Sequence, residues 1–453
     1  MEWLQLLSIK RFGESDSRTP QNQFRSAFEV DYDRIIFSHP FRRLQDKTQV
    51  FPLPEHDFVH TRLTHSLEVS SVGRSLGKRV GEEIIRKSEP LQKAGITPFD
   101  FGAIVASASL AHDLGNPPFG HSGESAISDF FLNNPVAHEF KSALSEKEWA
   151  DLIKFEGNAQ GFRILNKKGS NGLKLTFAAL ASFTKYPRES LIGEVDPNRK
   201  SHKKFGLFQS EIGIYAELAK DMGLKQLSDS DKVWCRHPLA FLVEAADDIC
   251  YSIIDFEDGC RLGLVTLHET IELFSEIIGE KFDSAKLAKI KDKDEKVAVL
   301  RAMAISRLIE ESAEVFLENE PEILTGEFDS ALTSIISSAK ILDEIESLSI
   351  NRIYRCDQVV EREAAGYSIL DGLLSAFCLA AFNKTSRIES LTGKQKGVLR
   401  LLPESIQLSI KEQHSPYGVI QCVTDFVSGL TDSYALTLYQ RINGISVPMN
   451  RQY

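Results

Sequence analysis

One short stretch of the chain, residues 110–124, contains the residue types that metal-dependent hydrolysis needs. It reads LAHDLGNPPFGHSGE, so the adjacent pair His112 and Asp113 is followed by His121 and Glu124. An imidazole and a carboxylate can bind a divalent cation. Residues three apart share one face of a helical turn, so Glu124 can orient the His121 ring for proton transfer. A lone His-Asp pair is usually a solvated helix end, so the interpretation depends on residues elsewhere.

A helix predicted over residues 238–258 supplies a second group of polar residues. At about 100° per residue, Asp247, Tyr251 and Asp255 fall on one face, away from an apolar stripe that predicts the buried side. Acidic helix faces are usually exposed to solvent. A tyrosine between the two acids makes a purely solvent-exposed face slightly less expected. This helix alone therefore does not establish a site.

His65 lies in the first turns of a long predicted helix, and Arg62 precedes it by one turn. With His112, Asp113 and Asp247 it gives two imidazoles and two carboxylates. Such a mixed N/O set suits Mg, Mn, Fe, Ni or Zn. A metal held this way polarises a phosphoryl oxygen or lowers the pKa of bound water, and Arg62 adds a cation for phosphate. The residues together are consistent with phosphoryl-transfer chemistry.

Apolar spacing predicts helices along most of the chain and almost no strands. The predicted helices span 31–45 with a break at Pro40, 61–87, 99–113, 122–133, 147–166, 172–184, 238–258, several within 266–350, 357–383 and 418–441. Residues 185–206 form a cation-rich loop, and 49–52 an extended piece. We expect an all-α bundle with the metal site between its helices. Residues 1–265 would form an N-terminal arm and the core, and residues 266–453 a packed C-terminal helical subdomain.

Composition narrows the class of protein. The 453 residues are 42% hydrophobic and 26% charged, which is typical of a globular chain with a sizeable core. The net charge of −11 excludes a protein whose surface is basic overall and binds nucleic acid through that charge. Six cysteines without a Cys-x-x-Cys motif indicate a reduced, cytoplasmic protein. We find no window of about 18 apolar residues and no signal peptide, so no membrane association is expected.

A series of long motifs, in order along most of the chain, resembles one family of HD-domain metal phosphohydrolases. Besides residues 110–124, the motifs are RIIFS at 34–38, FRRLQDKTQVFP at 41–52, TRLTHSLEV at 61–69, FEGNAQGFR at 155–163, EAADDICYS at 244–252 and DFVSGLTD at 425–432. A lone His-Asp pair is a weak signal, whereas this ordered series is specific. The chain resembles the deoxyguanosinetriphosphate triphosphohydrolase-like (dGTPase or dNTPase) family.

The resemblance implies a metal and a catalytic pair. His65, His112, Asp113 and Asp247 match the ligands of a divalent metal ion, Mg²⁺ or Mn²⁺. We prefer Asp247 to its neighbour because a tyrosine and a second acid follow at +4 and +8, as in the family pattern. His121 and Glu124 match the catalytic pair near the α-phosphate.

The resemblance also implies residues that bind the substrate. They are Gln49 and Asp255 at the sugar 3′-hydroxyl, Tyr251 near the sugar or the phosphates, Arg62 at the triphosphate, and Asn116 and Asn158 at supporting polar positions. The family's triphosphate-binding lysines do not align securely here. The segment 203–206 is their plausible source, and Lys204 is the preferred residue.

The activity implied by the resemblance is metal-dependent hydrolysis of dNTPs, with dGTP favoured, at the α-phosphorus. The products would be a deoxynucleoside and inorganic triphosphate, and the family is commonly a homo-oligomer such as a hexamer. Two alternatives stay open: another HD-domain phosphohydrolase, such as a nucleotidase or phosphodiesterase, and a nucleotide-sensing or single-stranded DNA-binding protein. Single-stranded DNA also stays open as an effector. The sequence fixes neither base preference, native metal nor oligomer size.

Overall fold

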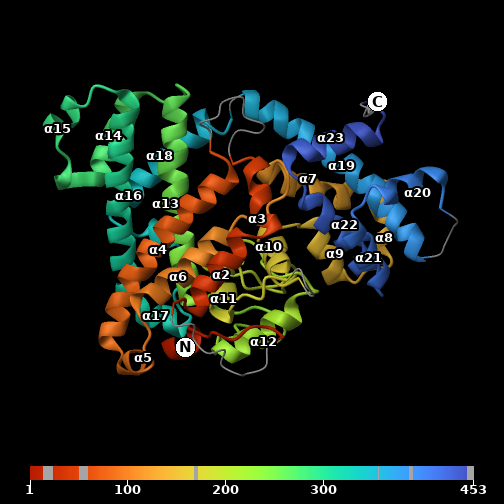
Figure 1. Cartoon of the computed structure of the whole chain (residues 1–453), viewed down its shortest axis with the longest axis horizontal. Helices are drawn as coiled ribbons and strands as arrows, with labels where there is room; N and C mark the ends of the chain where they lie inside the picture. The colour runs from red at the N-terminus through yellow and green to blue at the C-terminus, as the bar shows by residue number, and fades with distance from the viewer. Residues whose placement is uncertain (14–23, 50–59, 168–171, 356, 387–390, 446–453) are drawn as a thin grey trace.

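The computed structural model describes residues 1–13, 24–49, 60–167, 172–355, 357–386 and 391–445. Within these ranges the chain forms α-helices and short 3₁₀ turns, and its extended contacts are isolated bridges rather than strands (Figure 1). The predicted all-α fold is confirmed. The extended piece predicted at 49–52 lies outside the described residues from residue 50 onward.

A first hydrophobic cluster joins the long helices of the N-terminal half to those that follow α13. Four 3₁₀ turns accompany the helices in the described part of the chain, η1 Leu44–Asp46, η2 Lys200–His202, η3 Gly279–Lys281 and η4 Leu332–Ser334. The α-helices on this side are α1 Trp3–Leu6, α2 Ala27–Ile36, α3 His39–Arg43, α4 Arg62–Lys87, α5 Glu89–Lys93, α6 Pro98–Ala111, α11 Phe177–Phe183, α12 Ile212–Met222, α13 Pro238–Arg261, α14 Leu267–Ile278, α15 Ser284–Lys289, α16 Lys293–Glu318, α17 Glu320–Thr325 and α18 Ala339–Arg352.

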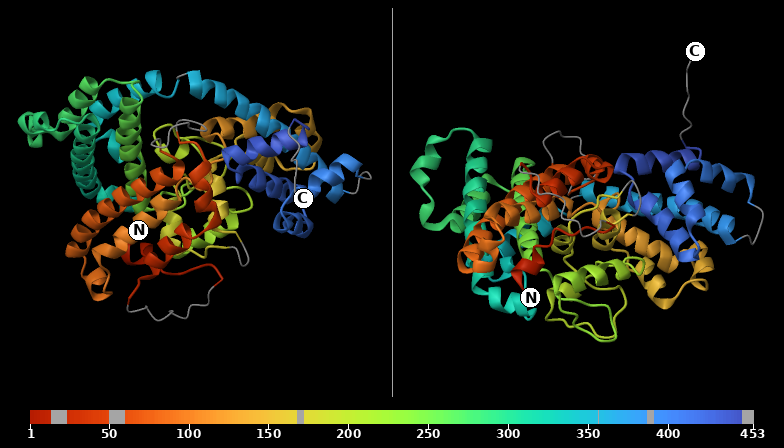
Figure 2. Two further views of the ribbon diagram at one scale, coloured as in Figure 1. Left: turned by 45° about the horizontal axis from the view of Figure 1, so that its top comes forward. Right: turned by 60° about the horizontal axis from the view of Figure 1, so that its bottom comes forward.

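A second hydrophobic cluster joins four shorter helices to the C-terminal part of the chain. Its helices are α7 Gly120–Asn133, α8 Pro135–Lys141, α9 Glu146–Ile153, α10 Gly157–Leu165, α19 Asp357–Ser386, α20 Gly393–Arg400, α21 Glu404–Glu412, α22 Pro416–Ser428 and α23 Asp432–Ile442. The views of Figures 1 and 2 agree that α7 to α9 lie among the C-terminal helices. The predicted division at residue 265 stays a prediction, and the hydrophobic clusters themselves divide the chain at other points.

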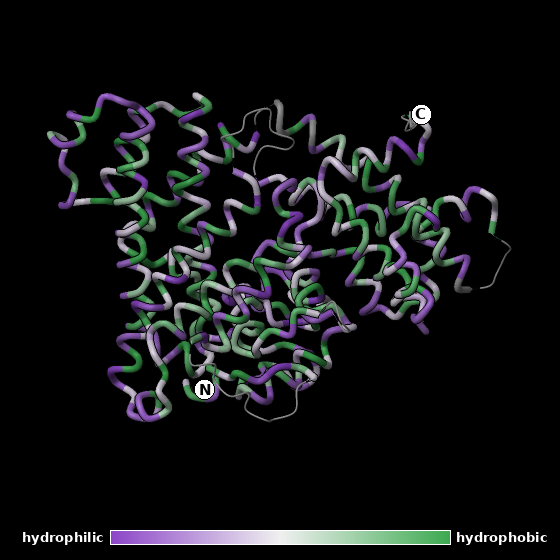
Figure 3. Tube along the Cα trace, in the orientation of Figure 1, coloured by the Kyte–Doolittle hydropathy of each residue, from purple (hydrophilic) through white to green (hydrophobic). Residues whose placement is uncertain are grey.

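Helices α4 and α6 pack at very short range because three glycines of α4 face α6. A Cβ added to Gly77 would lie 2.7 Å from the backbone oxygen of Phe101. One added to Gly73 would lie 2.5 Å from Ser109 Oγ, and Gly81 meets the Phe101 ring in the same way. Larger side chains would push the helices apart. Figure 3 shows hydrophobic and hydrophilic residues alternating along most helices, which is typical of amphipathic packing, whereas α6 is apolar almost throughout.

Helix α13 is the central helix of the site and is longer than the predicted 238–258. Its N-cap is His237, whose ring accepts a hydrogen bond from the Leu239 amide, and Pro238 occupies the first turn. The predicted apolar stripe is buried. Asp255, expected on a separate polar face, is only 1% exposed, whereas Tyr251 on the same face is 38% exposed, so that face is covered only in part.

Several predicted helix boundaries are wrong, each for a local reason. Residues 147–166 form α9 and α10, separated before Gly157, and 418–441 form α22 and α23, separated at Gly429. The helix predicted from 172 begins at Phe177, after Lys174 with a positive φ of 48°. The break expected at Pro40 falls just before it, because Pro40 sits in the first turn of α3.

Helix α19 corrects the expectation that no window is long and apolar enough to cross a membrane. Residues Glu363–Lys384 meet that test by length and composition. One such helix is weak evidence for a span, because core helices pass the same test. Here 56% of the window is buried, and α19 packs against α7 and α22 in the second cluster.

Candidate active site

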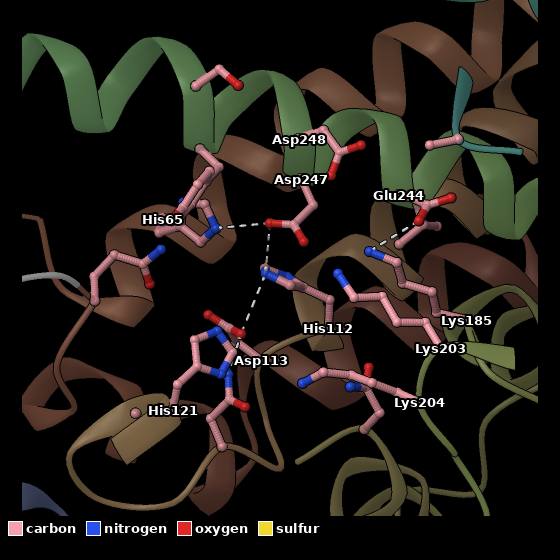
Figure 4. A pocket seen from close by; sticks show the side chains of 18 of the residues that line it. His65, His112, Asp113, His121, Lys185, Lys203, Lys204, Glu244, Asp247 and Asp248 are labelled. Atoms are coloured by element: carbon pink, nitrogen blue, oxygen red, sulfur yellow. Dashed lines mark hydrogen bonds and ion pairs between the residues drawn. The ribbon is translucent and has the colours of Figure 1, made fainter. Parts of the chain in front are cut away.

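One cavity of about 670 Å³ brings together nearly all of the predicted site residues. Its walls include residues of α4, α13 and α18, the segment joining α6 to α7, and the cation-rich loop (Figure 4). The predicted residues that line it are Gln49, Arg62, His65, His112, Asp113, Asn116, His121, Glu124, Asn158, Lys204, Asp247 and Tyr251. Asp255, the remaining one, contacts the wall from behind through Tyr354.

Three of the predicted metal ligands point at one another. His65 Nε2 lies 3.2 Å from Asp247 Oδ1, and His112 Nε2 lies 3.5 Å from the same oxygen (Figure 4). One ligand atom from each of the three lies within 4.8 Å of the others, close enough to share one ion. His112 Nδ1 is 2.6 Å from the Ser109 carbonyl, which fixes the tautomer that leaves Nε2 free to bind a metal.

The charge states around this cluster suit a divalent cation. Burial opposes ionisation of Asp247, but the neighbouring imidazoles outweigh it and hold the pKa of the carboxyl far below its usual range. Neutral imidazoles and an ionised carboxylate are the donors that Mg²⁺, Mn²⁺ and similar ions accept. His65 Nδ1 is buried and has no hydrogen-bond partner among the described residues. The donor set therefore fits a metal ion.

Asp113 stands beside this trio and is held by two polar neighbours. Its Oδ1 lies 3.6 Å from His112 Nε2, and its Oδ2 accepts a 2.7 Å hydrogen bond from Arg62 Nη1. Asn116 Nδ2 donates to Oδ1. Burial works against the charge, but Arg62 outweighs it, so the pKa of Asp113 is lowered. Arg62, predicted to bind the triphosphate, also orients a predicted metal ligand here.

The two adjacent aspartates of α13 face different partners. Asp247 faces the imidazoles, whereas Asp248 Oδ2 accepts a 2.6 Å hydrogen bond from Thr333 Oγ1. Burial raises the pKa of Asp248 to about 6. The geometry thus agrees with the choice of Asp247 as the ligand, which stays a prediction.

His121 and Glu124 form a hydrogen-bonded pair on the first turn of α7. His121 Nδ1 lies 2.8 Å from Glu124 Oε2, and the imidazole is 79% exposed to the cavity and solvent. Glu124 is buried, and its Oε1 accepts a 2.7 Å hydrogen bond from the Gly157 amide. Burial would raise the pKa of Glu124, but His121 and Lys204 lower it. An ionised, fixed carboxylate behind an accessible imidazole is suited to proton transfer.

The motif at residues 155–163 requires a glycine at position 157. A Cβ on Gly157 would lie 2.3 Å from Asn116 Oδ1 and 2.7 Å from Glu124 Oε1. Only glycine lets α10 begin this close to the two side chains. Asn158, the next residue, hydrogen-bonds Glu156 and lines the cavity.

Four lysines line the cavity, and the sequence pointed to only part of this group. Lys204 Nζ lies 3.0 Å from Glu156 and 3.7 Å from Glu124, so it adjoins the His121 pair. Lys185 Nζ lies 3.2 Å from Glu244, one turn before Asp247 on α13. The remaining two are Lys200 and Lys203. Their shared signal was the cation-rich loop 185–206, which did not show which of its cations face the site.

An aromatic wall stands on the other side of Asp247. Tyr251 stacks on Tyr354, with ring centroids 5.4 Å apart and an interplanar angle of 27°. Tyr354 Oη donates a 3.1 Å hydrogen bond to Asp255 Oδ2, and burial raises the pKa of Asp255 to about 7. Gln49 lines the same cavity, and its Oε1 has no partner among the described residues. Sequence reasoning missed Tyr354, which follows α18 without any recognisable pattern.

Three further acids lie at the edge of the cavity near the tyrosines, and the sequence gave no reason to single them out. They are Asp343, Glu346 and Glu363. Asp343 and Glu346 are one turn apart on α18, whereas Glu363 belongs to α19. The cavity therefore contains carboxylates in addition to those that pair with its lysines.

Comparison with known proteins assigns two parts of the chain to domain families, and residues 167–336, which hold Asp247 and the cation-rich loop, lie between them. Residues 62–166 match the HD domain, which includes His65, His112 and the His121 pair. Residues 337–441 match the phosphohydrolase-associated domain. A deoxyguanosinetriphosphate triphosphohydrolase-like protein of Synechocystis is 44% identical over 99% of this chain and all of its own length.

The chain belongs to the deoxyguanosinetriphosphate triphosphohydrolase-like family. Another member, from Pseudomonas aeruginosa, is 38% identical over 99% of this chain and all of its own length. A deoxyguanosinetriphosphate triphosphohydrolase of Klebsiella pneumoniae is 29% identical over 96% of this chain and 97% of its own. HD-domain enzymes of this family are metal-dependent phosphohydrolases, and the cavity supplies a His/Asp cluster that can bind a metal.

Proposed function

We propose that this protein is a metal-dependent dNTP triphosphohydrolase that favours dGTP. It would hydrolyse the substrate at the α-phosphorus and release a deoxynucleoside and inorganic triphosphate. The relatives' names support the reaction class, and two of the three describe triphosphohydrolase-like proteins. Assembly as a homo-oligomer and a single-stranded DNA effector stay predictions.

The order of groups along α13 is the observation that supports this proposal most strongly. Glu244, which holds Lys185, comes first, then Asp247 at the metal cluster, then Tyr251 at the aromatic wall. Successive groups are about one turn apart, roughly 5 Å along the helix. Phosphate-binding cations, a metal and a sugar platform thus follow one another as the parts of a nucleoside triphosphate do. The α-phosphorus would lie at the metal.

The residues of the chain divide the reaction among them. The lysines balance the charge of the triphosphate, and His121, held by Glu124, exchanges a proton with the attacking or the leaving oxygen. A bound divalent cation would polarise the phosphoryl group and lower the pKa of the attacking water. Cleavage of the dNTP bond between the α-phosphorus and the 5′-oxygen then consumes one water molecule.

The sugar clamp gives a physical reason for selecting deoxyribose. Gln49 would bind the 3′-hydroxyl and Tyr251 would pack against the sugar, whereas Asp255 lies behind the cavity wall and would hold Tyr354 in place there. A 2′-hydroxyl enclosed there without a partner is costly. We expect ribonucleotides to be poor substrates.

The acidic edge of the cavity supports a preference for guanine. Carboxylates accept hydrogen bonds, and guanine presents two neighbouring donors, N1–H and the 2-amino group. Asp343, Glu346 and Glu363 line the cavity, and we expect one of them to accept these hydrogen bonds. Adenine presents an acceptor nitrogen at the equivalent ring position, which would meet a carboxylate without a proton between them.

Product analysis tests the proposal directly. Purified protein is incubated with each dNTP and with GTP, in Mn²⁺ or Mg²⁺, with a chelator as control, and products are resolved by phosphorus NMR. We expect metal-dependent release of deoxynucleoside and intact triphosphate, fastest for dGTP and slowest for GTP. Release of orthophosphate or pyrophosphate would instead indicate a different HD-domain phosphohydrolase. Equal rates for all dNTPs would contradict the guanine preference alone.

A further inference from the structure

The segment between α6 and α7, residues 112–119, carries one end of the site and is tied to the C-terminal helices. It begins at His112 and leads directly into the turn that bears His121. Near its end Phe119 has φ of 64°, in the left-handed region that a residue with a side chain rarely adopts. Such a conformation persists only where surrounding contacts hold it.

Asp432 supplies the contact that holds this conformation. Its Oδ1 accepts a 3.0 Å hydrogen bond from the Phe119 amide. Its Oδ2 accepts a 3.1 Å bond from the Thr48 amide and a second bond from the Thr48 hydroxyl. Asp432 is 1% exposed and begins α23, where the helix dipole also favours a negative charge.

Lys47 adds a second tie between the same parts. Its buried ammonium donates to the Asn116 carbonyl at 2.5 Å and to the Ser428 carbonyl at 2.9 Å. Asn116 belongs to the segment before α7, and Ser428 is the last residue of α22, where a cation meets the negative end of the helix. The Phe119 ring completes the attachment, since a Cβ on Gly366 of α19 would lie 2.9 Å from it.

We propose that Asp432 is a positioning residue for catalysis, which sets His121 and Gln49 on the two rims of the cavity. One carboxylate oxygen fixes the backbone two residues before His121, and the other fixes the residue before Gln49. The phosphohydrolase-associated domain is thereby part of the active-site machinery rather than only a neighbour of it. This inference rests on the proposed function for its kinetic consequences.

The neighbouring Asp425 gives a matched control in the same motif. It also joins the C-terminal helices to the HD domain, by accepting hydrogen bonds from Gln160 at 2.9 Å and from Arg163 at 2.8 Å. Those bonds go to α10, which packs against Gly115 of the segment before α7, but none of them reaches the Phe119 amide. Asp425→Asn therefore weakens the attachment of the domain without releasing the Phe119 amide.

The bonds of Asp432 to Phe119 and to Thr48 can be tested by separate substitutions. Asp432→Asn replaces one acceptor oxygen with an NH₂ group that opposes a donor N–H, so at least one bond is lost. Displacement of a catalytic group by about 1 Å costs up to roughly 100-fold, and we expect kcat to fall about 10- to 100-fold. Thr48→Val, which removes only the hydroxyl beside Gln49, should raise KM several-fold and change kcat less. Manganese affinity should stay within about twofold of wild type in both.

Hydrogen exchange of the whole protein provides a readout that does not depend on activity. In Asp432→Asn, amides in the peptide 114–124 should exchange about tenfold faster or more, and in Asp425→Asn they should not. Unchanged exchange in Asp432→Asn, or equal kcat losses in both variants, would overturn the positioning role. Wild-type protein that protects these amides yet releases no triphosphate would contradict the proposed function and leave the positioning role intact.

Discussion

The two ends of the active-site cavity are built by different parts of the molecule. The metal end uses His65, His112 and Asp247, on or at the ends of long helices of the first hydrophobic cluster. The proton-transfer end uses His121 and Glu124, on α7 in the second cluster with the C-terminal helices. The first end is fixed by helix packing that includes the glycine contacts between α4 and α6, and the second by hydrogen bonds from distant residues.

Because of this difference, the two ends should respond differently to the loss of a single contact. Ligands on rigid, closely packed helices keep their spacing when a remote contact is removed, because several contacts position each helix. A segment held in a rare conformation by a few hydrogen bonds and one aromatic contact has fewer contacts that could replace a lost one. We therefore expect metal binding and turnover to respond differently to substitutions at the two ends.

The largest effect should come from the metal end. Asp247→Ala removes the carboxylate that both imidazoles face, so metal binding should weaken strongly and turnover should fall about 1000-fold or more. Asp248→Asn is the matched control and should retain metal binding, since Asp248 contacts Thr333 instead. Calorimetric titration with Mn²⁺ and a dGTP assay measure both. Wild-type activity in Asp247→Ala would refute the ligand assignment.

The proton-transfer end should lose rate without losing metal. His121→Ala removes the imidazole that Glu124 orients, and general acid–base catalysis contributes typically about 100- to 10,000-fold. We expect kcat to fall by about 100-fold or more, with Mn²⁺ affinity unchanged. A parallel loss of metal affinity would show that the two ends are not separate.

The sugar clamp should affect binding more than rate. Tyr354→Phe removes the hydrogen bond to Asp255, worth about 1 kcal/mol, so KM for dGTP should rise about fivefold. Tyr417→Phe is the control, because Tyr417 donates a similar bond to Asp151 in the second cluster. Initial-rate kinetics on both variants distinguish the cases, and an equal rise in KM for both would contradict the clamp.

The smallest effect on activity is expected from Asp151, which links α9 to Tyr417 and Ser190. Burial raises the pKa of Asp151 to about 7, from an ordinary 3.8. At pH values between these two pKa values, Asp151 keeps its proton in the folded state and releases it in the unfolded state. The contribution of Asp151 to stability therefore falls as the pH rises through this window.

Denaturant unfolding at several pH values tests this linkage. Relative to Asp151→Asn, the wild-type free energy of unfolding should fall by about 1.4 kcal/mol per pH unit between pH 4 and 7. Above pH 7 the stability curves of the two proteins should run parallel. Parallel curves throughout that window would show that Asp151 is ionised in the folded protein. Activity at pH 7.5 should change little in the variant.

The sequence predicted the helical class, and 12 of the 13 predicted site residues line the cavity. His65, His112 and Asp247 were found because each stands in a motif of the family that the chain resembles, and their residue types suit a metal. Tyr354 and Lys185 could not be placed, because each is a single polar residue whose partner is distant in the chain. The bond from Asp432 to Phe119 is of the same kind, since no local spacing relates those positions. Helix ends at Gly157 and Gly429 depended on contacts that apolar periodicity does not record.

The most direct test of the central claim is the fate of the water oxygen. Wild-type protein is incubated with dGTP and Mn²⁺ in ¹⁸O-labelled water, and both products are weighed by mass spectrometry. Attack at the α-phosphorus predicts one ¹⁸O in the inorganic triphosphate and none in deoxyguanosine. Label in orthophosphate or pyrophosphate, or in a released nucleotide, would contradict the assignment of the metal and His121 to the α-phosphorus.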